Sequence, residues 1–197
     1  MTVAEVSRAA DLHEPDGWMA GTWTIDAAHS TVTFAVRHLM SRVRGTFSDV
    51  SGEIVTGAEP AGSSVTAIIA VASVSTGNPM RDEHLRSADF FDVEWHPAMT
   101  FASGALRPAG EHWVLSGELT IRDVTRPVDL AVEFLGTDLT GLQGETRIGF
   151  AACTTISRRD FGVTFGLAAD GAKIIVADWV DIVLDIEAFL VACEDAR

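Results

Sequence analysis

The sequence predicts an all-β fold, an eight-stranded antiparallel up-and-down barrel with one or two short helices in its connecting loops. Apolar residues recur at every second position in eight separate segments, which is the period of a strand with one apolar face. Clusters of Gly, Pro, Asp and Ser separate most of these segments. Closing such strands into a ring removes the two open edges of a flat sheet. With 197 residues, of which 47% are hydrophobic, the chain can build one such domain around a full core.

The strand-like segments follow one another from residue 31 almost to the end of the chain. In the first, Val32, Phe34 and Val36 share one parity while smaller or polar residues take the other. The expected strands are 31–38, 47–56, 63–76, 95–104, 113–121, 128–134, 147–152 and 180–187. Two segments break this rhythm. Residues 79–91 have apolar residues at helical spacing after a proline, which predicts a short helix, and residues 157–161 predict a single turn.

The barrel domain is expected to span residues 21–191, after a mobile acidic N-terminal arm at 1–20 and before a C-terminal tail at 192–197. The chain starts without an apolar signal segment, and no run approaches the roughly 18 apolar residues of a membrane span. Together with only two cysteines, this predicts a cytoplasmic protein without stable membrane insertion. The net charge of −14 argues against nucleic-acid binding, because the protein has few cations to neutralise phosphates.

The alternation also predicts which side chains converge inside the barrel. An eight-stranded barrel is just wide enough to be filled by side chains or to hold one small ligand. The residues expected to line a central channel are Phe34, Val36, Ile54, Phe101, Phe150, Ala152 and Ile182. Alternation alone leaves open whether this interior is a solid core or a hollow.

Few polar residues show a pattern typical of catalysis or metal binding. His29 and Ser30 are adjacent, and neighbouring strand residues point to opposite faces, so they do not form a nucleophile–base pair. We expect Asp26, His29 and Ser30 to close a hydrogen-bonded turn, and we assign no catalytic residue. His38 and His84 lack the spacing of a zinc motif, so no metal site is expected.

Three side chains are candidates for contacting the polar head group of a ligand at the barrel mouth: His38, His84 and Arg81. His38 ends an apolar inward face, so it is either a hydrogen-bonded core histidine or a head-group contact. Guanidinium groups bind phosphates and carboxylates bidentately, which favours the same role for Arg81. The arginines of the two non-strand segments are Arg81, Arg86, Arg158 and Arg159. Because acidic residues lie beside all four in the sequence, local ion pairs are the alternative interpretation.

Several motifs occur along the chain in a definite order. They are Ile25-Asp26-Ala27-Ala28-His29-Ser30, Phe34-x-Val36-Arg37-His38, Gly45-x-Phe47, Met80-Arg81-Asp82-x-His84-Leu85-x-Ser87-x-Asp89-Phe90-Phe91-Asp92, Pro97-x-x-x-Phe101, Gly117-x-Leu119-Thr120-Ile121-Arg122-Asp123-Val124-Thr125-x-Pro127 and Ser157-Arg158-x-Asp160-Phe161-Gly162. In this order they resemble the YceI-like, polyisoprenoid-binding family over about residues 22–190. The chain departs from that pattern at Asp123, where members often have glycine. It also has an acidic leader in place of a signal peptide, and so resembles the cytoplasmic branch.

The resemblance implies a lipocalin-like barrel with a hydrophobic channel that holds a long isoprenoid chain or a similar amphiphile, and often a homodimer. The family has no agreed catalytic residues, so none is carried over. We therefore expect a lipid carrier, storage or sequestration protein without a cofactor, whose bound molecule would be a polyprenyl or quinone-like lipid. The alternative is an enzyme on the same barrel, of the cyclase or isomerase type, that acts on an apolar metabolite.

Overall fold

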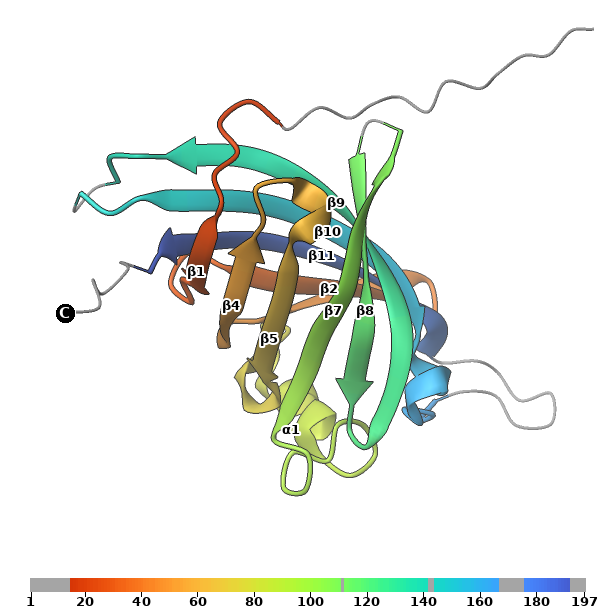
Figure 1. Cartoon of the computed structure of the whole chain (residues 1–197). Coiled ribbons are helices and arrows are strands. Elements are labelled where there is room, and N and C mark those ends of the chain that lie inside the picture. Colours follow the sequence, from red (N-terminus) through yellow and green to blue (C-terminus); the bar gives the residue numbers. More distant parts are fainter. Residues whose placement is uncertain (1–14, 111, 142–143, 167–175, 192–197) are drawn as a thin grey trace, which may run out of the picture.

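The computed structural model describes residues 15–110, 112–141, 144–166 and 176–191, which form a closed antiparallel β-barrel (Figure 1). Eight strands make the ring, and the pairing of the last with the first closes it. In ring order they are β1 (Gly21–Ile25), β4 (Val50–Thr56), β5 (Ser64–Ala70), β7 (Ala98–Ala109), β8 (His112–Ile121), β9 (Val124–Asp138), β10 (Arg147–Ser157) and β11 (Val176–Leu190). The eight-stranded barrel that the sequence predicts is confirmed.

Three further strands extend the wall beside β11. The C-terminal residues 188–190 of β11 pair with β1, whereas residues 176–185 pair with β2 (Thr31–His38). The long strand β11 therefore pairs with β1 along one part of its length and with β2 along another. A hairpin joins β2 to β3 (Ser41–Phe47), and the two-residue β6 (Val74–Ser75) pairs with the end of β3.

The strand boundaries differ from the expected ones: β1 lies outside every expected segment, several strands are longer, and two expected strands divide. The expected strand 47–56 divides at residues 48–49, so that Phe47 ends β3 and Val50 begins β4. The expected strand 63–76 becomes β5, the 3₁₀ turn η2 (Val71–Ser73) and β6. The alternation did not reveal the first part of β3, because Val43 is its one large apolar residue between Ser41 and Gly45.

The helix expected at 79–91 is confirmed over Pro79–Arg86 only, and the turn expected at 157–161 is confirmed as a 3₁₀ turn. The helix α1 (Pro79–Arg86) has a proline in its first turn, and the Asn78 side chain accepts a hydrogen bond from the Arg81 main-chain N–H. The 3₁₀ turn η3 (Arg158–Phe161) ends at Gly162, whose φ of +75° favours glycine. A third 3₁₀ turn, η1 (Pro60–Gly62), precedes β5. Within the described ranges, every helix is too short or too polar to span a bilayer.

The best-buried side chains include one that ties β1 to its neighbour β4. Trp23 in β1 is fully buried, and its indole N–H donates to the Thr56 hydroxyl at the end of β4 over 2.8 Å. Val50, Val71 and Phe161 are also almost completely buried. Most of the expected N-terminal arm, residues 1–14, and the expected tail at 192–197 lie outside the described residues.

Candidate functional site

A large apolar cavity lies inside the barrel. It holds about 240 Å³ of space that the centre of a water molecule could occupy, far more than the roughly 10–15 Å³ that one buried water requires. All seven side chains that the alternation predicts for the channel lie in its wall: Phe34, Val36, Ile54, Phe101, Phe150, Ala152 and Ile182. The structure thus brings these residues together around a hollow, which alternation alone did not establish.

The wall of this cavity is apolar throughout. Thr56, Thr154 and Arg158 contribute to it, but only apolar atoms face the hollow. Two of these residues direct their polar groups to the protein: the Thr56 hydroxyl donates to the Met19 carbonyl, and the Arg158 guanidinium donates to main-chain carbonyls. A ligand inside the cavity therefore meets hydrocarbon surface, and a polar head group finds its partners outside.

One end of the cavity is bounded by the residues that precede β1. Trp18 belongs to the cavity wall, and its indole N–H donates to the Gly57 carbonyl over 2.9 Å. The same ring meets Phe134 of β9 and Phe150 of β10 edge to face, with centroid distances of 5.3 and 6.2 Å. Part of the segment that the sequence predicts as a mobile arm is therefore packed into the barrel.

The other end is bounded by the segments that are not strands. Leu85 from α1, Phe90 and Phe91 after it, and Phe161 and Val163 in and after η3 all line the cavity. Sequence reasoning missed these residues and Trp18, because it searched only strands for inward side chains. The turn Pro15-Asp16-Gly17-Trp18 carries a sequence signal, since proline followed by glycine predicts a reversal that would return Trp18 to the barrel.

None of the three candidate head-group residues belongs to the cavity wall. The Arg81 guanidinium donates to the Thr76 hydroxyl over 2.7 Å and to its carbonyl over 3.0 Å. His84 shares a hydrogen bond of 2.8 Å with Asp89, and its ring packs edge-on against Phe90. His38 is half-buried at the end of β2. Their role in contacting a ligand stays a prediction.

The interpretation of the arginines as ion-pair partners of neighbouring acids is wrong for Arg81, Arg86 and Arg158. Arg86 donates to the carbonyls of Ala72 and Val74, and Arg81 to Thr76. Arg158 is only 6% exposed, and it donates four hydrogen bonds of 2.7–3.0 Å. Its acceptors are the carbonyl oxygens of Val163, Phe165, Val176 and Ala177. Burial lowers the pKa of Arg158, which the charge of Asp178 partly opposes.

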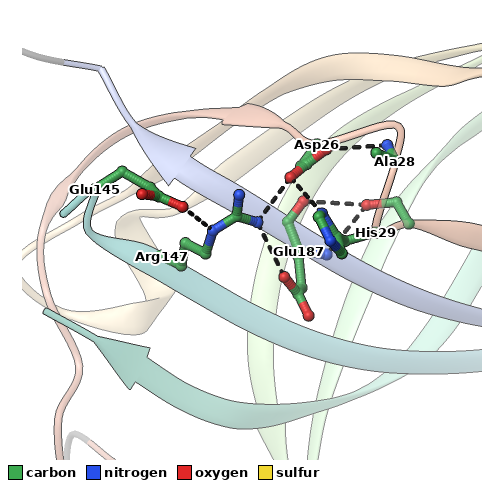
Figure 2. Close-up of polar contacts among 7 residues, drawn as sticks. Asp26, Ala28, His29, Glu145, Arg147 and Glu187 are labelled. Atoms are coloured by element: carbon green, nitrogen blue, oxygen red, sulfur yellow. Dashed lines mark hydrogen bonds and ion pairs between the residues drawn. The ribbon is translucent and has the colours of Figure 1, made fainter. Parts of the chain in front are cut away.

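The polar residues before β2 form the hydrogen-bonded turn that the sequence predicts (Figure 2). One Asp26 oxygen accepts the Ala28 N–H, and the other contacts the His29 ring over 2.7 Å. Ser30 is directed away from this pair, because its hydroxyl donates to the main-chain carbonyl of Glu187. The arrangement lacks a contact between serine and histidine, and it serves to join the β1–β2 turn to β11.

Arg147 connects this turn to the start of β10. Its guanidinium contacts Asp26 and Glu145 over 2.7 Å each and Glu187 over 3.1 Å (Figure 2). The hydrogen bond from His29, with further help from Arg147, lowers the pKa of Asp26 to about 2. The hydrogen bonds to Glu145 and Asp26 raise the pKa of Arg147. We call Asp26, His29, Glu145, Arg147 and Glu187 the Arg147 cluster.

Possible metal ligands and cysteine thiols are the remaining reactive groups of the described residues. Within the described ranges, no three His, Cys, Asp or Glu side chains gather closely enough to hold a metal ion. Cys153, in β10, is exposed with a free thiol. Cys193 lies outside the described residues.

Known proteins resemble this chain in sequence and in structure. The model of the YceI-like domain matches residues 23–188. A UPF0312 protein of Ectopseudomonas mendocina is 36% identical over 174 residues, which cover 86% of this chain and 87% of the relative. The crystal structure of BcnA from Burkholderia cenocepacia is 28% identical and superposes with a TM-score of 0.73, covering 83% of this chain and 98% of BcnA.

A second solved structure shares the fold at low identity. It is described as a polyisoprenoid binding domain from Saccharophagus degradans implicated in plant cell wall breakdown. It is 18% identical, with a TM-score of 0.66 over 88% of this chain and all of that one. The fold, the order of its motifs and the extent of the domain match agree, and this chain belongs to the YceI-like domain family.

Proposed function

We propose that this protein binds a long-chain isoprenoid or a similar amphiphilic lipid, with the tail inside the barrel, as a carrier, storage or sequestration protein. The observation that carries the proposal is the hollow interior with an entirely apolar wall. A packed barrel would have filled this space with side chains. The polyisoprenoid-binding description of the Saccharophagus degradans domain supports the same class of ligand.

Hydrophobic transfer alone can supply the binding free energy. Each Å² of tail removed from water contributes roughly 25 cal/mol, and the ordering of the flexible tail offsets part of this gain. Because the wall offers no polar atom, the head group would remain at the rim or in water. Selectivity for the tail should therefore exceed selectivity for the head group. Cytoplasmic localisation and a homodimer stay predictions from the sequence.

A pair of neighbouring alanines in β10 provides a matched test. Ala152 faces the cavity, whereas Ala151 is absent from its wall and lies between Glu133 and Asp185 on the neighbouring strands. An indole at 152 fills the hollow, so we expect Ala152→Trp to lose at least about tenfold in affinity for solanesol, and Ala151→Trp to bind like the unmodified protein.

Native mass spectrometry of gently purified protein, before and after addition of solanesol, measures this difference. Thermal melts of both variants confirm that each is folded. A protein that carries no extractable lipid and takes up neither farnesol nor solanesol would contradict the proposal. Equal binding by the two tryptophan variants would contradict the placement of the tail in the cavity.

A further inference from the structure

A tight turn brings Trp18 back onto the barrel. The Trp18 main-chain N–H donates to the Pro15 carbonyl over 2.9 Å, which closes a four-residue turn. Gly17 adopts a φ of +82° at the third position, the conformation that glycine allows most easily in a type II turn. The direction of the Trp18 side chain is thus set by the local sequence.

The Trp18 ring bridges opposite walls of the barrel. Its indole N–H is bound to Gly57, directly after β4, and its ring packs against Phe134 in β9. In the ring of eight strands, β4 and β9 are separated by three strands in either direction. A side chain that contacts both must lie across the lumen, since no shorter path joins them along the wall.

The segment that carries Trp18 is tied to Thr56, which also binds the neighbouring strand β1. The Thr56 hydroxyl donates to the Met19 carbonyl over 2.6 Å and accepts the Trp23 indole N–H over 2.8 Å. Thr56 is 3% exposed, so these bonds are shielded from water. Trp18 is therefore held as a fixed part of the cavity wall at this end.

We propose that Trp18 is the end wall of the cavity and sets the maximum tail length that the barrel accepts. This inference rests on the proposed function, since it concerns the ligand of the same cavity. The end of a tail that fills the cavity from its α1 and η3 side would meet the indole ring. Truncation of Trp18 to alanine removes an indole, which occupies the space of roughly one to two isoprene units. The limit should then shift upward by at least one unit.

The test uses a series of all-trans prenols that begins at farnesol and extends several isoprene units beyond solanesol, with occupancy measured by native mass spectrometry. For the unmodified protein we expect a sharp fall in occupancy above one chain length. Trp18→Ala should move this limit to longer prenols, and Trp18→Phe, which keeps an aromatic ring but loses the bond to Gly57, should move it less. Trp179→Ala is the matched control, because Trp179 lies outside the cavity wall and is 63% exposed.

The outcomes separate the inference from the proposed function. If the unmodified protein binds prenols and the Trp18 variants keep its length limit, the end wall is overturned while the binding function stands. If Trp179→Ala shifts the limit as much as Trp18→Ala, the inference is likewise overturned. Binding of no prenol by the folded, unmodified protein would overturn both. Should Trp18→Ala fail to fold, Trp18→Phe alone decides.

Discussion

Arg147 is the first residue of β10 and Arg158 directly follows its last, so the two guanidiniums lie at opposite ends of the same strand. Arg147 contacts three carboxylates, and hydrogen bonds to Glu145 and Asp26 raise its pKa. Arg158 contacts only main-chain carbonyls in the described part of the chain, and burial lowers its pKa. The same side chain thus stabilises one end by charge pairing and the other by hydrogen bonding.

This difference has a structural reason. Val163 and Phe165 follow η3, and Val176 and Ala177 begin β11, where its register with β2 is irregular between Val176 and Val180, so carbonyls in both places need donors. A planar guanidinium supplies up to five N–H groups in a fixed fork and can satisfy several of them at once. At the Arg147 end, strands β1, β10 and β11 are already paired, and the arginine instead offsets the repulsion among Asp26, Glu145 and Glu187.

The largest effect is expected at Arg158. Arg158→Met removes the donors of four main-chain carbonyls, one buried and three partly buried, and we expect a loss of about 3 kcal/mol in the free energy of unfolding. Arg158→Lys keeps the charge but not the fork, so it should recover only part of this loss. Urea denaturation at low and high salt measures both variants. Full recovery by lysine, or a loss that disappears in salt, would show that charge rather than hydrogen bonding matters at this end.

A smaller effect is expected at Arg147, whose side chain is 22% exposed. Arg147→Met leaves three carboxylates near one another, so we expect the melting temperature to fall by a few degrees in low salt and by less in high salt. Arg107→Met is the control, because the Arg107–Asp129 pair is exposed on both sides and should contribute little. A fall in the melting temperature of Arg147→Met that does not depend on salt would show that charge pairing does not distinguish this end of β10 from the Arg158 end.

Contacts between residues close in the sequence could be predicted, whereas contacts between distant residues could not. The part of the turn that joins Asp26 to His29 was predictable, because Asp26 binds groups two and three residues away, whereas the Ser30 hydroxyl bonds instead to the Glu187 main chain in β11. Alternation likewise placed the seven channel residues, since one parity of a strand faces one side. The contact between Asp26 and Arg147 joins residues 121 apart, and nothing in the local pattern points to it.

The errors have equally specific causes. The acids beside Arg81, Arg86 and Arg158 suggested ion pairs, yet the acceptors include main-chain carbonyls in all three cases. Every residue carries a carbonyl, so the sequence does not indicate which ones need a donor. Trp18 was assigned to a mobile arm because its partners, Gly57 and two phenylalanines, are brought near it only by barrel closure.

The smallest expected effect is the contribution of Asp26 to the pH dependence of stability. In the folded protein the pKa of Asp26 is lowered from 3.8 to about 2, first by the hydrogen bond from His29 and then by Arg147. The unfolded state therefore binds the proton more readily, so the contribution is complete above about pH 4 and is lost as the pH falls through about 2. Asp26→Asn should lower stability at neutral pH and flatten its decline in this range. Glu133→Gln, which changes an exposed carboxylate on β9, should leave the decline unchanged. Urea titrations between about pH 5 and pH 2 compare the two variants, and equal slopes would show that the Arg147 cluster does not hold Asp26 in its charged form.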